Sequence, residues 1–176
     1  MKALLRDVTL HRPDATLLDA LDDAVPTVAR WCARLGGPRV DPEDAAQDVL
    51  ALATRRLSSL RDPSMLEPWL YGITRRVLAA HRRRVWWKRW VANVSPDEPD
   101  VRRDPEHEVA ARMRSRQLQG WLERLPSAQR EVVVLCALEE RSSVEAARLL
   151  GLPVGTVKSR MRLGMARLRT LAGESP

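Results

Sequence analysis

The chain has 176 residues, 44% of them hydrophobic and 30% charged, a composition that predicts a soluble folded protein of one or two small domains and excludes a disordered chain. Its net charge of +7 and pI near 10.6 favour a polyanionic partner, with nucleic acid ahead of a membrane surface. No apolar run approaches the roughly 18 residues of a membrane span, and Met1–Leu10 lacks the apolar core of a signal peptide. We therefore expect no membrane insertion and a cytoplasmic location.

No arrangement of side chains predicts an enzyme or a metal site. Cys32 and Cys136 lie far apart in apolar helical contexts, which is typical of small buried side chains in a reducing compartment, and the three histidines are scattered. The sequence has no nucleophile elbow, glycine-rich phosphate loop or paired-carboxylate pattern. We expect no catalytic residues, no metal ligands and no cofactor.

Apolar residues recur at helical spacing along the chain, and no strand alternation persists, which predicts an all-α fold. In the first half we expect three helices and one loop: a helix over Ala15–Leu35 that bends at Pro26, a helix from Pro42 to about Leu57, a loop at Ser58–Glu67, and a helix from Pro68 to Trp90. Asp41 has the side chain of an N-cap, and proline suits the first helical position that follows it.

The composition changes abruptly after the third helix. Ser95–Asp100 is acidic and contains two prolines, which is typical of an exposed, flexible linker. We expect two small helical domains, residues 15–90 and 108–172, joined by an acidic linker over residues 91–107. In the second half we expect four helices: Pro105–Arg124, Ser127–Glu139, a short helix from Ser142, and Val154–Leu171.

The last two of these helices have the sequence of a helix-turn-helix. Ser142 and Glu145 have capping-box spacing, so each side chain can accept a hydrogen bond from an unpaired backbone amide at the helix start. Gly151 tolerates the left-handed conformation that ends a helix, and Pro153 suits the start of the next. Ala147 and Val157 supply the small residue and the buried β-branched residue that a helix-turn-helix needs.

The final helix combines an apolar face with a cationic one. From Leu152 to Ala172 there are five cations and no acids, and Val157, Met161 and Gly164 share the arc that must face the core. A solvated basic face explains this pattern if it is taken alone. Next to the turn signature, the pattern favours a recognition helix in the major groove of duplex DNA.

A second basic cluster lies at the end of the first half. It runs from Arg75 to Arg89 without an acid, and tryptophans interleave with it. Cations beside flat rings suit single-stranded or melted DNA, because unstacked bases need an aromatic surface. Since the chain has no Phe, Trp86 and Trp90 are as readily explained by packing, and whether these tryptophans and Trp87 pack or contact DNA is left open.

A third cluster is acidic. Asp44, Gln47 and Asp48 share a narrow arc of the predicted second helix, opposite its apolar residues. Acids at a helix start complement the helix dipole, and that explanation competes with a docking face for a basic partner surface. The spacing is compatible with both.

Four segments together resemble one family. They are Asp41–Val49, Trp69–Arg76, Leu125–Val132 and Val154–Arg160. In order and spacing they resemble an extracytoplasmic-function (ECF) sigma factor of bacterial RNA polymerase, over residues 15–172. The resemblance implies that the chain binds core RNA polymerase and directs promoter-specific initiation, with region 2 in the first domain and region 4 in the second. It also implies a possible anti-sigma factor as partner.

The resemblance assigns roles to particular residues. Asp44, Gln47 and Asp48 would dock on the clamp of the largest polymerase subunit. Contacts to the melted −10 element would come from Ser64, Trp69, Tyr71, Arg75, Arg76, His81, Arg82 and Arg83. Contacts to the duplex −35 element would come from Thr156, Lys158, Ser159, Arg160, Arg162 and Arg167.

The chain also departs from the family pattern. Leu50 and Thr54 stand where the family usually has aromatic residues, and Leu163 stands where a basic residue is common. A stand-alone helix-turn-helix regulator and a protein-interaction module with basic faces are the alternatives. No motif of the chain identifies which promoter, regulon or inducing signal it serves.

Overall fold

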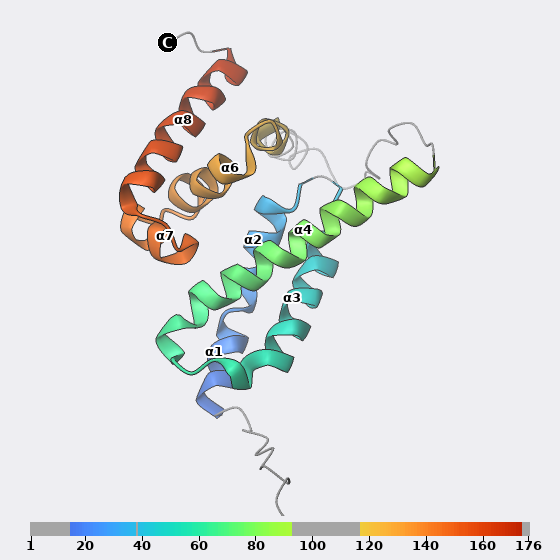
Figure 1. The fold of residues 1–176 in the computed structure, drawn as a ribbon, viewed down its shortest axis with the longest axis vertical. Coiled ribbons are helices and arrows are strands. Elements are labelled where there is room, and N and C mark those ends of the chain that lie inside the picture. The colour runs from blue at the N-terminus through green and yellow to red at the C-terminus, as the bar shows by residue number, and fades with distance from the viewer. Residues whose placement is uncertain (1–14, 38, 93–116, 174–176) are drawn as a thin grey trace, which may run out of the picture.

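Two groups of helices lie side by side in the computed structural model, which describes residues 15–37, 39–92 and 117–173. The helices α1 to α4 form one bundle, and α6 to α8 form a second group beside it (Figure 1). The described residues contain no strand, so the predicted all-α fold is confirmed. The acidic segment Ser95–Asp100 and most of the predicted linker 91–107 lie outside the described residues.

The first bundle contains α1 (Ala15–Asp23), α2 (Val25–Leu35), α3 (Pro42–Arg56) and α4 (Leu66–Ala92). The expected bend near Pro26 is a break between two helices, and Pro26 occupies the first turn of α2, where a missing N–H breaks no intrahelical bond. At the start of α3, the Asp41 carboxylate accepts hydrogen bonds from the amides of Glu43 (2.8 Å) and Asp44 (3.1 Å), as its N-cap pattern predicts.

Two short 3-10 turns, η1 (Leu57–Ser59) and η2 (Pro63–Met65), join α3 to α4. Helix α4 begins at Leu66, earlier than the predicted Pro68, because a proline in the first helical turn leaves no intrahelical bond unmade. The last turns of α4 extend beyond α2 and α3 (Figure 1). The C-terminal end of α4, which carries part of the basic cluster Arg75–Arg89, therefore lies outside the bundle.

Large aromatic side chains close the core of the first bundle. Trp31 of α2 and Tyr71 of α4 are both fully buried and meet edge to face, with ring centroids 5.0 Å apart. That geometry is the favoured one for aromatic pairs. The pair therefore fixes α4 against α2.

The second group contains a helical segment at residues 117–123, then α6 (Ser127–Val133), η3 (Val134–Leu138), α7 (Ser143–Leu150) and α8 (Val154–Ala172). We predicted one helix over Ser127–Glu139, and the structure differs because η3 is a wider π turn in which the Glu139 amide donates to the Val134 carbonyl at 2.9 Å.

Helices α6 and α8 approach closely at Gly164. A methyl group added at this glycine would lie 2.7 Å from Cγ2 of Val133, which is shorter than any normal carbon–carbon contact. Gly164 and Val157 are the buried residues of α8, so the predicted apolar arc of this helix faces α6. This packing sets the orientation of the opposite, cationic face.

Candidate nucleic-acid interface

Helices α7 and α8 form the predicted helix-turn-helix. The Ser142 hydroxyl accepts from the Glu145 amide at 3.2 Å, and the Glu145 carboxylate accepts from the Ser142 amide at 2.8 Å. Gly151 is left-handed (φ 64°), and the Leu152 amide donates to the Ala147 carbonyl at 3.0 Å, which completes a Schellman stop. Both ends of α7 are thus fixed by local hydrogen bonds, and they set the turn into α8.

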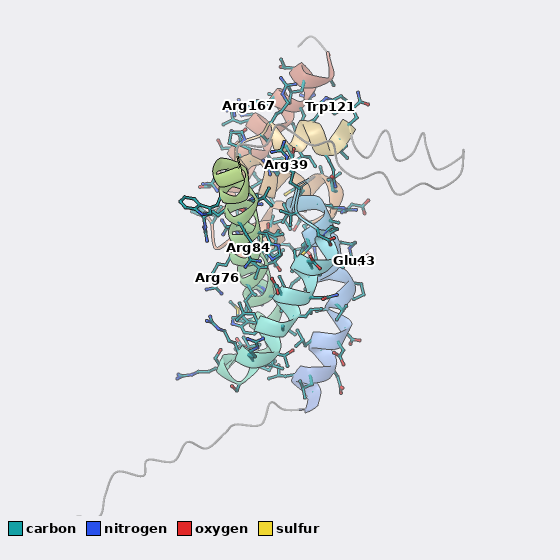
Figure 2. The ribbon with its side chains drawn as sticks, turned by 90° about the vertical axis from the view of Figure 1, so that its right-hand side faces the viewer. Arg39, Glu43, Arg76, Arg84, Trp121 and Arg167 are labelled. Carbon is teal, nitrogen blue, oxygen red and sulfur yellow. The ribbon has the colours of Figure 1, made fainter. Side chains whose placement is uncertain are left out.

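The outward face of α8 carries the cations that the sequence assigned to duplex DNA. Lys158, Ser159, Arg162 and Arg167 are exposed, whereas Thr156 and Arg160 are half-buried. Arg167 projects from α8 in Figure 2. Leu163 lies on the same outward face and is 43% exposed, as its position on the helical wheel predicts. The face is cationic with one apolar interruption.

A groove of about 620 Å³ runs along α4 and is lined on its far side by α6. Its lining residues are Pro68, Trp69, Gly72, Arg75, Arg76, Ala79, Arg82, Ser127 and Glu131. Arg76 and Arg84 project from α4 into the solvent (Figure 2). Arg83 is also exposed, and Trp69 is half-buried at the groove wall. The structure therefore gathers Trp69, Arg76 and Arg83 on an accessible surface.

Three other residues predicted to contact the −10 element are buried or hydrogen-bonded within the chain. The expected contact of Tyr71 with DNA stays a prediction; in this structure its ring is fully buried against Trp31 and does not face solvent. Arg82 is half-buried, and its guanidinium donates to the Leu35 carbonyl at 2.8 Å, at the end of α2. Ser64 is exposed, but its backbone carbonyl accepts from Arg148 of α7 at 2.9 Å.

The tryptophans at the end of α4 are described only in part. Trp87 is 57% exposed, far more than a core tryptophan would be. The side chains of Trp86 and Trp90 lie outside the described residues. The exposure of Trp87 argues against a core position for this residue, and the choice between packing and DNA contact stays open for Trp86 and Trp90.

The acidic face of α3 is accessible. Asp44, Gln47 and Asp48 are all exposed, while Ala45 and Val49 on the opposite side are buried. Oδ2 of Asp48 lies 2.8 Å from Nε2 of His81 on α4. The predicted polymerase-docking face and the predicted −10 helix therefore meet at this pair.

The two groups of helices are joined by hydrogen bonds and ion pairs that no local sequence pattern signals. Glu139, whose side chain is 7% exposed, pairs with Arg34 and, at 3.4 Å, with Arg30. Arg34 also donates to the Leu138 carbonyl at the end of η3. Arg141 pairs with Glu67 at the start of α4.

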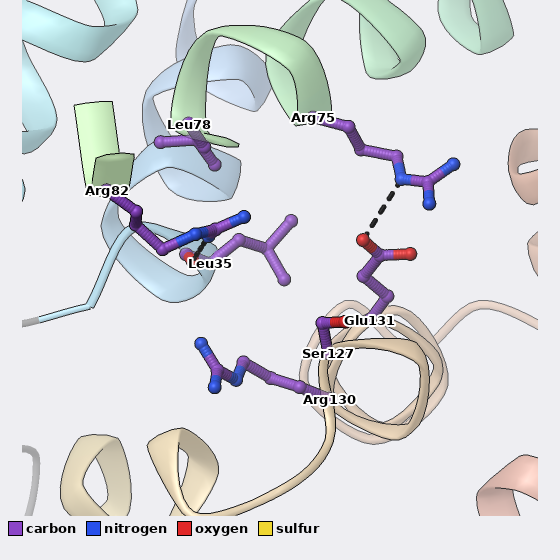
Figure 3. A pocket seen from close by; sticks show the side chains of 7 residues that line it. All are labelled: Leu35, Arg75, Leu78, Arg82, Ser127, Arg130 and Glu131. Carbon is purple, nitrogen blue, oxygen red and sulfur yellow. Dashed lines mark hydrogen bonds and ion pairs between the residues drawn. The ribbon is translucent and has the colours of Figure 1, made fainter. Parts of the chain in front are cut away.

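Arg75 and Glu131 make a further contact between the groups, with the Arg75 Nε donating to Oε1 at 3.0 Å (Figure 3). Beside them, Arg82 from α4 and Arg130 from α6 reach into the same narrow space. Burial lowers the pKa of both guanidiniums, and the charge of Arg82 lowers the pKa of Arg130 further. Glu131 is the one carboxylate among the residues that line this space, so it offsets three arginines.

Within the described residues, no cluster of histidine, cysteine, aspartate and glutamate side chains is arranged to hold a metal ion. Among the helices so described, none combines the length and apolarity that a membrane crossing requires. The charged surfaces described above lie on α4 and α8, which carry cations, and on the acidic face of α3.

Two family models match this chain in the order of its two helical groups. The model described as Sigma-70 region 2 matches residues 21–88, and the model described as Sigma-70, region 4 matches residues 115–168. Together they cover most of the described helices.

Full-length relatives agree with these matches. The ECF RNA polymerase sigma factor RpoE of Cereibacter sphaeroides is 30% identical over 173 residues, which cover 95% of this chain and 92% of the relative. The RNA polymerase sigma factor CnrH of Cupriavidus metallidurans is 31% identical over 156 residues, 82% of this chain and 80% of that one.

Two solved structures share the fold. CnrH, solved in complex with the cytosolic domain of CnrY, has a TM-score of 0.65 at 25% identity and covers 91% of this chain and 89% of its own. The sigma factor RpoE of Bartonella quintana, solved with the anti-sigma factor NepR, has a TM-score of 0.67 at 24% identity, over 93% of this chain and 100% of that one.

Proposed function

The chain belongs to the ECF family of RNA polymerase sigma factors, and we propose which of its surfaces carry out that family's task. It binds core RNA polymerase and directs promoter-specific, DNA-templated initiation, as a transcription initiation factor rather than a catalytic enzyme. We assign no catalytic residue to it. Residues 15–90 serve as region 2, residues 91–107 as the linker and residues 108–172 as region 4. Its place of action is the cytoplasm.

Region 4 reads duplex DNA through the outward face of α8. The observation that carries this assignment is the helix-turn-helix itself, with a capped α7, a left-handed Gly151 and a cationic α8 that packs on its apolar side. Its proposed −35 contacts are Thr156, Lys158, Ser159, Arg160, Arg162 and Arg167. Arginine can pair with a guanine edge through two hydrogen bonds, while the other cations hold phosphates.

Region 2 reads the melted −10 element along α4. The accessible contacts are Trp69 and Arg76, which line the groove of about 620 Å³, and Arg83, which is exposed further along α4. An aromatic wall beside cations suits unstacked bases on a charged backbone. Ser64, Arg75, His81 and Arg82 stay proposed −10 contacts, although each has a hydrogen-bond partner in this structure: Arg148, Glu131, Asp48 and the Leu35 carbonyl respectively. Tyr71 is left out while it is buried.

The acidic face of α3 docks on the clamp of the largest polymerase subunit. Asp44, Gln47 and Asp48 are exposed side by side on one face, which supports a contact with a basic surface. An anti-sigma factor is a further proposed partner, since a sigma factor of similar fold has been solved in complex with one.

Charge reversal tests the docking face. Asp44→Lys should weaken comigration with core polymerase at least tenfold, because it replaces attraction by repulsion and leaves the Asp48–His81 pair intact. Asp19→Lys, an exposed acid on α1, is the charge-matched control. Equal binding by the two variants would contradict the proposed docking face.

Arginine removal tests the reading helix. Arg160→Ala should cost about 1–3 kcal/mol in promoter binding and relax the preference at one −35 position. Arg124→Ala, an exposed arginine outside α8, is the control. A uniform loss across all sequences would instead mark Arg160 as a phosphate contact.

A further inference from the structure

We propose that Leu163 reads a thymine methyl group in the −35 element, so that one position of the promoter is recognised by an apolar contact. Six large apolar side chains are exposed among the described residues, and Leu163 is the one that lies on the reading helix α8. The inference rests on the proposed −35 role of α8 and adds a specificity-determining residue to it.

The packing of α8 does not account for a leucine at this position. The apolar side chains that hold α8 on its core are Val157, which is fully buried, and Met161, Met165 and Leu168, which are partly buried. At about 100° per residue, Leu163 lies about 120° from Val157 and about 160° from Met161 around the helix. Its side chain is 43% exposed. Since alanine favours a helix at least as well as leucine, the fold alone does not need this side chain.

Leu163 lies in the middle of the residues assigned to the −35 element. At about 100° per residue, four of them lie within about 60° of it around the helix, namely Thr156, Ser159, Arg160 and Arg167. Along the axis, at about 1.5 Å per residue, Leu163 is about 10 Å from Thr156 and about 6 Å from Arg167. A duplex held by these four side chains therefore meets Leu163 as well.

The charge of this face favours duplex DNA over a protein as its occupant. From Leu152 to Ala172 there are five cations and no acids, which complements phosphate on both strands. Lys158 and Arg162 are exposed on one flank of the stripe, about 140° and about 100° from Leu163. In a major groove about 12 Å wide, these flanking cations face the phosphates of one wall while Leu163 faces the base edges.

A leucine can recognise one feature of the base edges. It has no hydrogen-bond donor or acceptor, and the C5 methyl of thymine is the apolar group that base pairs present in the major groove. Against a polar base edge, Leu163 would displace water without replacing its hydrogen bonds, which is unfavourable. Against the methyl group, both partners bury apolar surface. The structure therefore favours an A·T pair at the position that Leu163 meets.

The test removes the methyl group from the DNA and nothing else. Transcription starts of the reconstituted holoenzyme first identify a promoter. Deoxyuridine, which lacks only the C5 methyl, then replaces each −35 thymidine of either strand in turn. We expect one position at which holoenzyme affinity falls about fourfold, the effect of exposing one methyl-sized group. At that position, 5-methylcytosine should bind more tightly than cytosine.

Three variants connect this methyl group to the leucine. Leu163→Ala should bind the thymidine and deoxyuridine promoters equally. Leu18→Ala is the matched control and should keep the fourfold difference, because Leu18 is 38% exposed and lies on α1, in the other group of helices. Leu163→Arg should shift the preferred base toward guanine, whose edge accepts two hydrogen bonds from arginine.

The other outcomes are decisive as well. A wild-type affinity that no deoxyuridine substitution lowers would refute the proposal, as would a methyl dependence that Leu163→Ala retains. Each comparison is a ratio of two affinities of the same protein, so a partly unfolded variant does not mimic the result. In both refutations the chain-dependent starts would remain, and the proposed function with them. If no start depended on the chain, the proposed function would fail and this inference with it.

Discussion

The approach of α6 to α8 at Gly164 gives a stability prediction whose magnitude follows from the structure. A Gly164→Ala methyl would lie 2.7 Å from Cγ2 of Val133, about 1 Å inside the favourable carbon–carbon separation of about 3.5–4.0 Å. Val133 is buried and β-branched, so it has little freedom to move away. Overpacking of this kind costs about 1–3 kcal/mol.

Alanine also favours a helix over glycine by about 1 kcal/mol, which offsets part of the clash. The net expectation is a loss of about 1 kcal/mol, or about 2–4 °C in melting temperature for a chain of this size. Gly155→Ala on the same helix meets no atom within 4 Å, so it should leave the melting temperature unchanged or raise it. Thermal unfolding by circular dichroism compares the two. If Gly164→Ala is as stable as Gly155→Ala, the helices do not pack as described.

Three further predictions concern caps and buried groups. Ser142→Ala should destabilise the chain by about 1 kcal/mol in urea, because it removes the cap of α7; no loss relative to Ser58→Ala would contradict the capping box. Hydrogen bonds from Ser142 lower the pKa of Glu145 in the folded chain, so they stabilise the fold at neutral pH and this stabilisation is lost as pH falls below the ordinary pKa of 4.5. In Glu145→Gln the urea midpoint of unfolding should therefore decrease less on acidification than in the wild type. An equal decrease in both would refute this role of Glu145. Burial raises the pKa of Cys32 to about 11, so a thiol reagent at pH 8 should modify Cys136 first, and equal rates in the native chain would contradict the burial of Cys32.

Local signals in the sequence predicted the local structure well. Asp41, the Ser142–Glu145 box and Gly151 act within a few residues of themselves, and each does in the structure what its position predicts. The buried and exposed faces of α3 and α8 could also be predicted from the sequence, because they depend on helical periodicity alone.

Contacts between distant segments were not predictable in this way. Arg75 was assigned to DNA from its neighbours, yet its partner Glu131 lies 56 residues away and carries no matching local pattern. Tyr71 was assigned to DNA as part of an aromatic and basic segment, but its ring is buried against Trp31, which lies 40 residues earlier in the chain. The π turn at η3 was also missed, since its wider hydrogen bonding has no clear sequence signature.

The most direct test is transcription by the reconstituted holoenzyme. The purified chain is mixed with core polymerase and sheared genomic DNA of its source organism, and the 5′ ends of the transcripts are sequenced. We predict transcription start sites that depend on the chain and share two upstream motifs, one near −10 and one near −35. Arg160→Ala should weaken the base preference at one position of the −35 motif. Transcripts that do not depend on the chain, with duplex binding intact, would contradict the account.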